Sequence, residues 1–102
     1  MLALNPDIAV AARDAVQGAS SKATVATFDL SGDVVKAIKA GEILFAVDQQ
    51  QYLQGYLPVV FLTLNKTNAN TVGGGQPVLT GPGFVTKDNA ETVAQLAKDG
   101  TR

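Results

Sequence analysis

Asn5, Asp29 and Gln49 each follow a short apolar, strand-like run, which makes them candidates for a shared hydrogen-bonding site. A carboxylate accepts hydrogen bonds strongly, whereas an amide side chain both donates and accepts them. A carboxylate flanked by two amides is therefore suited to the hydroxyl groups of a sugar, with Asp29 accepting from two adjacent hydroxyls. Asp48, which immediately precedes Gln49, is an additional candidate of the same kind.

Each of these residues also has a purely structural interpretation. Asn5 stands before Pro6 and Asp7, a pattern typical of a helix start in which the asparagine caps the first turn. An aspartate such as Asp29, close before a Ser-Gly pair, is often a turn residue. Taken singly, each position favours the structural interpretation. Their agreement at one edge of a sheet is what favours the functional one.

The residue types that are absent narrow the chemistry. The chain contains no cysteine and no histidine, so it lacks disulfides, a thiolate nucleophile, the commonest metal ligand and the commonest general base. We therefore expect no metal and no cofactor. The formal net charge is -1 and the basic residues are scattered along the chain, which argues against binding to nucleic acid.

An enzyme is the rival class of protein. Catalysis would have to use Asp29 with Asp48, because carboxylate pairs support glycoside chemistry and this pair would make the chain a small α/β hydrolase. Two strand-end carboxylates without a deep cleft are a poor arrangement for such a reaction. We therefore interpret the chain as a binding module and not as an enzyme.

The hydrophobic pattern predicts alternating strands and helices. In the helix that contains Pro58, that proline should cause a bend and Tyr56 should lie in the core. Asn89 should cap the last helix. The strands are expected at 2–4, 22–30 and 43–47, the last of them buried on both faces, and the helices at 5–18, 31–40, 50–66 and 89–98, with a polar loop at 67–76 and extended chain at 77–86.

This alternation predicts an α/β fold with a partial doubly wound, Rossmann-like parallel sheet. Ligands bind at the carboxyl ends of the strands in such sheets, where Asn5, Asp29 and Gln49 would meet. Three main strands are few, so we expect part of the sheet to be missing before Met1 and the first strand to have an open edge. Pairing with another copy, as a homo-oligomer or through a swapped segment, would hide that edge.

No segment reaches the roughly 18 apolar residues that a membrane crossing requires, and no signal peptide is visible. Four segments are informative: Phe28-Asp29-Leu30-Ser31, Ile38-Lys39-Ala40-Gly41, Val47-Asp48-Gln49-Gln50 followed by Tyr52-Leu53-Gln54-Gly55-Tyr56, and the run TGPGFVTKDN at 80–89. The run at 48–56 and the TGPGFVT stretch at 80–86 are specific in combination. Together the four segments resemble the C-terminal part of type I periplasmic sugar-binding proteins, the solute receptors of bacterial ABC importers. The resemblance covers nearly the whole chain.

The resemblance implies roles for single residues. In the ribose-binding branch of the family, an Asn at a helix start, an Asp in a Phe-Asp pair and a Gln after the following strand bind sugar, and Asn5, Asp29 and Gln49 match them. Asp48 departs from that pattern, where a small residue is usual, so the preferred sugar stays open.

The resemblance also implies what the chain carries of the whole receptor. Residues 1–86 would be a partial C-terminal sugar-binding lobe with a hinge segment near 77–86, and residues 87–102 a C-terminal helical tail. Family members close two lobes on a sugar, so this chain alone should bind a monosaccharide weakly or not at all. The parent protein would be periplasmic and would dock on an ABC membrane permease. The alternative is the sensor domain of a lactose-repressor-type regulator, which is disfavoured because no DNA-reading segment is present.

Overall fold

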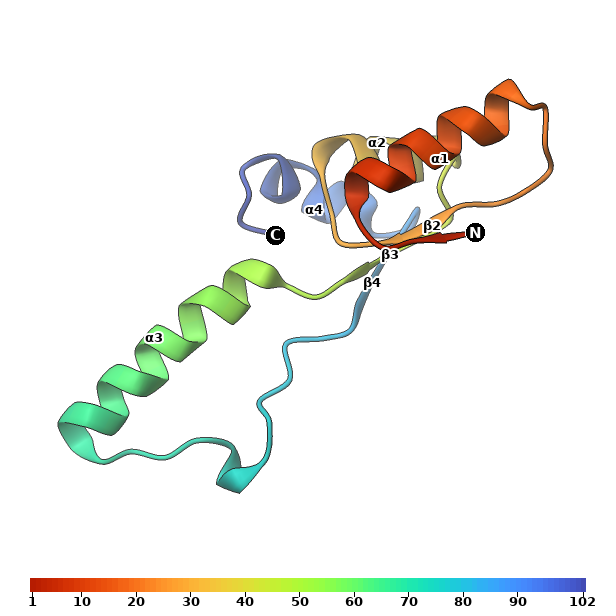
Figure 1. Cartoon of the computed structure of the whole chain (residues 1–102). Coiled ribbons are helices and arrows are strands. Elements are labelled where there is room, and N and C mark those ends of the chain that lie inside the picture. Colours follow the sequence, from red (N-terminus) through yellow and green to blue (C-terminus); the bar gives the residue numbers. More distant parts are fainter.

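The chain folds around a four-stranded sheet whose strands lie in the order of the sequence, β1-β2-β3-β4 (Figure 1). The computed structural model describes every residue from Met1 to Arg102. The elements are β1 (Leu2–Ala3), α1 (Pro6–Gly18), β2 (Ala26–Phe28), α2 (Gly32–Ala40), β3 (Phe45–Asp48), α3 (Gln51–Asn68), the short 3-10 helix η1 (Gly73–Gly75), β4 (Gly83–Thr86) and α4 (Ala90–Lys98).

The sheet is mostly parallel, which confirms the predicted α/β class. β1 pairs with β2 and β2 with β3 in parallel, whereas β4 runs antiparallel to β3. The carboxyl ends of β1, β2 and β3 therefore share one edge. β2 is shorter than the expected strand at 22–30, because only Ala26, Thr27 and Phe28 have register partners in β1 or β3.

Capping residues set the helix boundaries much as the sequence indicates. Ser31 Oγ accepts a hydrogen bond from Val34 N at 3.2 Å at the start of α2, and Gly41 ends that helix with a φ of 80°. Asn89 behaves differently from the prediction. Its Oδ1 accepts from Thr86 N at 2.8 Å and its Nδ2 donates to Phe84 O at 2.9 Å, so the side chain closes a turn behind α4 and does not cap it.

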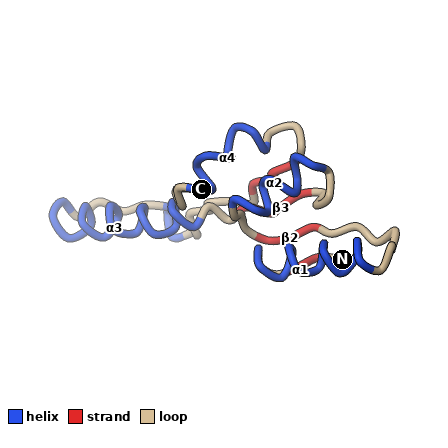
Figure 2. Tube along the Cα trace, turned by 90° about the horizontal axis from the view of Figure 1, so that it is seen from above, coloured by secondary structure: helices blue, strands red, loops and turns tan.

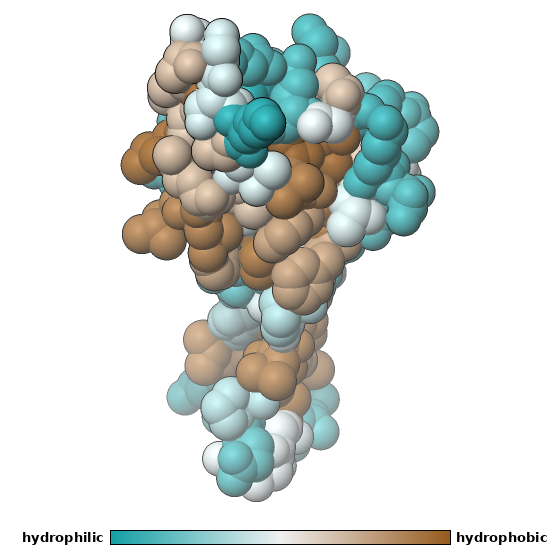
Figure 3. Space-filling view, turned by 90° about the vertical axis from the view of Figure 1, so that its right-hand side faces the viewer, coloured by the Kyte–Doolittle hydropathy of each residue, from teal (hydrophilic) through white to brown (hydrophobic).

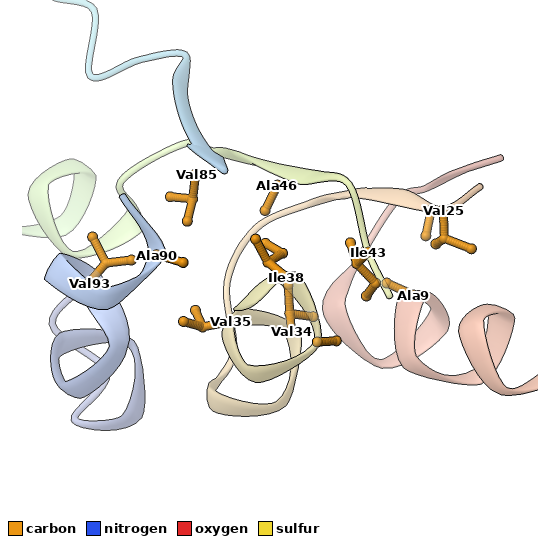
Figure 4. Close-up of a cluster of buried hydrophobic side chains, with 12 residues drawn as sticks. Ala9, Val25, Val34, Val35, Ile38, Ile43, Ala46, Val85, Ala90 and Val93 are labelled. Atoms are coloured by element: carbon orange, nitrogen blue, oxygen red, sulfur yellow. The ribbon is translucent and has the colours of Figure 1, made fainter. Parts of the chain in front are cut away.

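The hydrophobic core lies between one face of the sheet and the helices α1, α2 and α4 (Figure 4). Val34, Val35 and Ile38 of α2 are fully buried, as their spacing predicts. Ala90 and Val93 of α4 belong to the same cluster. Residues 87–102, expected as a helical tail, thus contain part of the core.

The opposite face of the sheet carries no helix of this chain (Figure 1). Phe28, Val47 and Phe84 are register neighbours across β2, β3 and β4 on this face. The rings of Phe84 and Phe45 meet edge to face with centroids 5.8 Å apart. The expectation that residues 43–47 are buried on both faces is wrong, because the helices present cover one face only, and Leu44 is 53% exposed.

Residues 49–82, here called the arm, project away from the body formed by residues 1–48 and 83–102 (Figures 1 and 2). The molecule measures 59 × 25 × 21 Å and has a radius of gyration of 16.8 Å, compared with about 13 Å for a compact chain of this length. Figure 3 shows the arm as the narrower lower part, with hydrophobic side chains on its surface.

Helix α3 runs along the arm, and none of its residues is buried. Its apolar residues repeat with helical spacing, but the face they form meets no other helix or strand of this chain. Tyr56, expected in the core, is therefore 58% exposed, and its ring stacks on that of Tyr52 with centroids 6.4 Å apart. Pro58 lies inside α3 without ending it. None of the helices combines the length and apolar character that a membrane crossing requires.

Candidate functional site

Asp29 and Gln49 come together at the carboxyl edge of the sheet, as their positions after β2 and β3 predict. Gln49 Nε2 donates to both carboxylate oxygens of Asp29, at 3.1 Å to Oδ1 and 3.2 Å to Oδ2. Both side chains are at the surface. The pair therefore presents carboxylate oxygens that accept hydrogen bonds and an amide oxygen that accepts another.

The backbone at Asp29 explains how this carboxylate reaches its place. Asp29 has a φ of 64°, a left-handed conformation that aspartate tolerates better than most residues. Its N–H donates to Val47 O at 2.8 Å, which ties the turn after β2 to the end of β3. Asp29 therefore has two roles: its backbone forms the turn after β2, and its carboxylate is presented at the surface.

Asn5 has the structural role that its sequence context predicts. Its Oδ1 accepts from Ile8 N at 2.9 Å and caps α1, and its main-chain oxygen accepts from Thr27 Oγ1 at 3.1 Å. No hydrogen bond joins Asn5 to Asp29 or Gln49. It lies at the same edge of the sheet because β1 is next to β2, and its Nδ2 group makes no hydrogen bond within the chain.

Asp48 differs from the other candidates because its side chain is completely buried. Its Oδ1 accepts from Gln50 N at 2.8 Å and its Oδ2 accepts from Arg102 Nε at 2.5 Å. Both oxygens are thus engaged inside the protein. A ligand would first have to break this ion pair, which argues against the suggestions that Asp48 contacts a sugar and that it joins Asp29 in a catalytic pair.

The main chain of Gln49 is held by residues that sequence reasoning did not single out. Gln49 O accepts from Gln54 Nε2 at 2.9 Å and from Thr80 Oγ1 at 3.0 Å. Gln54 Nε2 also donates to Thr80 Oγ1 at 3.0 Å, and Gln50 Nε2 donates to Thr80 O. In the sequence, these roles could have been indicated by the polar run Gln49-Gln50-Gln51 before a helix, followed by Gln54.

A groove of about 700 Å³ opens beside Gln49, between α3 and the returning segment at 77–82. Its walls include Gln54 and Thr80 together with apolar side chains. The apolar members are Phe28, Val47, Leu57, Phe61, Val78 and Leu79. The polar edge of the sheet is therefore continuous with this largely apolar groove along the arm.

The acidic residues do not gather into a metal centre. No group of three or more His, Cys, Asp or Glu side chains is close enough to hold a metal ion.

The comparisons with known proteins bear on this edge of the sheet. A scan of protein-family models and a search of curated proteins found no match. Among solved structures, a carbohydrate transporter from Acidothermus cellulolyticus 11B in complex with myo-inositol superimposes with a TM-score of 0.92. It is 46% identical, and the match covers 99% of this chain and 35% of that chain. The chain therefore matches this carbohydrate transporter in both fold and sequence.

A galactofuranose-binding protein also shares its fold with this chain. It superimposes with a TM-score of 0.76 at 21% identity, over 98% of this chain and 34% of its own length. The chain thus spans about a third of the length of the solved relatives that it matches. Both relatives are carbohydrate-transport or carbohydrate-binding proteins, which agrees with the interpretation of the chain as part of a binding module.

Proposed function

We propose that the chain forms one wall of the binding site of a sugar receptor that serves a bacterial ABC importer. The hydrogen-bonded pair of Asp29 and Gln49 at the carboxyl edge of the sheet is the observation that carries the proposal. Asn5 contributes its Nδ2 group from the next strand. The parent receptor would act in the periplasm and deliver its sugar to a membrane permease.

The chemistry of the wall supports a ligand with adjacent hydroxyl groups. The Asp29 carboxylate accepts hydrogen bonds from two neighbouring hydroxyls, and the amides of Gln49 and Asn5 complete the set. A monosaccharide has this arrangement, and so does a cyclic polyol such as the myo-inositol bound to the transporter from Acidothermus cellulolyticus. We infer that the ligand of this site is a monosaccharide or a cyclic polyol.

The arm suggests where a second lobe would join. Asp48 and Gly83 are register partners in β3 and β4, so the chain leaves the body and returns to it at adjacent positions. Two adjacent crossings are what a hinge between lobes requires. We therefore assign the hinge to the segment 77–86 together with the exit from β3 at Asp48, and the first part of the sugar-binding lobe to the strands before it.

The first test is a titration of this chain with pentoses, hexoses, deoxy sugars and myo-inositol, followed by calorimetry and by amide NMR spectra. We expect binding too weak for calorimetry, because one wall does not offset the cost of association. At high ligand concentration, shifts should be confined to the signals of Asn5, Asp29 and Gln49. They should disappear in Asp29→Asn.

Two results would overturn the proposal. Micromolar affinity would mean that the site is complete and not one wall. Shifts that appear elsewhere in the spectrum, or that persist unchanged in Asp29→Asn, would mean that these residues do not form the wall.

A further inference from the structure

We propose that Thr80 and Gln54 are positioning residues that hold Gln49 against Asp29 and so set the geometry of the sugar-binding wall from the arm. The inference rests on the proposed function for its biological meaning. The positioning itself is a property of the hydrogen bonds and can be tested without a ligand.

Gln49 occupies an exposed position. It follows the last residue of β3 and precedes Gln50, whose φ of 58° places it in the left-handed region. Neither the sheet nor the helix therefore fixes the peptide that carries the Gln49 oxygen. Its N–H, which belongs to Gln50, is held by Asp48 Oδ1 at 2.8 Å, and side chains from other parts of the chain have to hold its oxygen in place.

Two side chains from different segments supply that restraint. Thr80 Oγ1 donates to Gln49 O at 3.0 Å from the returning segment of the arm, and Gln54 Nε2 donates to the same oxygen at 2.9 Å from α3. Because Gln54 Nε2 is also 3.0 Å from Thr80 Oγ1, the three groups form a closed triangle. The triangle joins both sides of the arm to a single carbonyl.

Gln49 also connects that carbonyl to the sugar-binding wall. The Gln49 side chain donates to both oxygens of Asp29 at 3.1 and 3.2 Å. These distances are at the long end of the normal range, so a small rotation of the Gln49 peptide would break the contact. A movement of the arm therefore reaches Asp29 through Gln49, and the wall is correctly shaped only when the arm is in its observed position.

The test compares Thr80→Val, which keeps the shape of the side chain and removes the hydroxyl, with Thr80→Ser, which keeps the hydroxyl. The matched control is Thr63→Val, because Thr63 is also on the arm and its hydroxyl donates to a main-chain oxygen, that of Val59, at 2.7 Å. The readout is the side-chain amide signal of Gln49 in NMR spectra of the full chain. The reference for a lost contact is the same signal in Asp29→Ala.

We expect the Gln49 side-chain signal to move toward its Asp29→Ala position in Thr80→Val and to stay in place in Thr80→Ser and Thr63→Val. Gln54→Met should move it in the same direction. A Gln49 signal that is unchanged in a folded Thr80→Val variant would overturn the proposal. If Thr80→Val is unfolded, Gln54→Met decides the question by the same criterion.

A parallel sugar titration separates this inference from the proposed function. If the wall binds sugar, Thr80→Val should weaken the binding about fivefold, the effect expected for one ordinary hydrogen bond, and should have no further effect in a Gln49→Ala background. A loss of the same size in that background would contradict the positioning role. If no sugar shifts any signal of the wall while the Gln49 signal still responds to Thr80→Val, the positioning stands and the proposed function fails.

Discussion

Arg102 Nε lies 2.5 Å from Oδ2 of Asp48 and ties residue 102 to the last residue of β3. The Asp48 side chain is completely buried, whereas that of Arg102 is 33% exposed. Asp48 is also the register partner of Gly83, so the ion pair lies where both ends of the arm meet the body. One buried carboxylate thus holds together β3, the start of the arm and the C-terminal segment.

Arg102→Ala should lower the free energy of unfolding by about 3 kcal/mol, because it leaves a buried carboxylate without its counter-charge. Urea denaturation of both proteins measures the difference. The control is Lys39→Ala, which removes the exposed ion pair with Glu91 and should cost less than about 1 kcal/mol. Equal losses in the two variants would show that the Asp48–Arg102 pair contributes no more than a surface pair.

Ile38→Ala should destabilise the body by about 2–5 kcal/mol, since Ile38 is fully buried in the core and its loss leaves a cavity. The comparison is Leu62→Ala on α3, which removes an equally large side chain that is 70% exposed. That substitution should change the unfolding free energy of the body by less than about 0.5 kcal/mol. A large loss in Leu62→Ala would mean that the arm packs against the body or another molecule.

Gly41→Ala should cost about 1 kcal/mol although a methyl group would meet no atom within 4 Å. The reason is the φ of 80° at Gly41, which an L side chain adopts only with strain. Gly18 is the matched control, because it too has open space around it but no positive φ. Gly18→Ala at the end of α1 should leave stability unchanged or raise it by up to about 1 kcal/mol. Thermal unfolding of the two variants separates the backbone effect from packing.

The outer edge of β1 pairs with no strand, so we expect copies of the chain to associate through it. Sedimentation velocity over a range of concentrations should show a concentration-dependent dimer. Leu2→Lys, which places a charge on this edge strand, should weaken the association, whereas Leu96→Lys on α4 should not. A monomer at all concentrations would contradict the prediction.

The sequence predicts those parts of the fold whose causes are local. Asn5, Ser31 and Gly41 set helix boundaries through side-chain caps or a special φ, and these features can be read from neighbouring residues. The helical spacing of Val34, Val35 and Ile38 likewise identifies the buried face of α2. The pairing of Asp29 with Gln49 can also be predicted, because each residue directly follows its strand and the two strands are parallel.

Other features depend on what lies opposite a residue. The apolar repeat of α3 predicts a buried face at Tyr56, but no element of this chain covers that face. Asp48 has a side chain and a strand-end position typical of a site residue. Only the position of Arg102, 54 residues further along the chain, shows that its carboxylate is buried and paired. The roles of Gln54 and Thr80 also require the two sides of the arm to be adjacent, which no local pattern reveals.

The absence of any buried residue in α3 means that the arm and the body should not share one cooperative unfolding transition. A helix that buries none of its residues is stabilised mainly by its own backbone, which is marginal in water even for good helix-forming sequences. Amide hydrogens of residues 51–68 should therefore exchange with solvent far faster than those of α2, and a single melting temperature measured for the chain would describe the body alone.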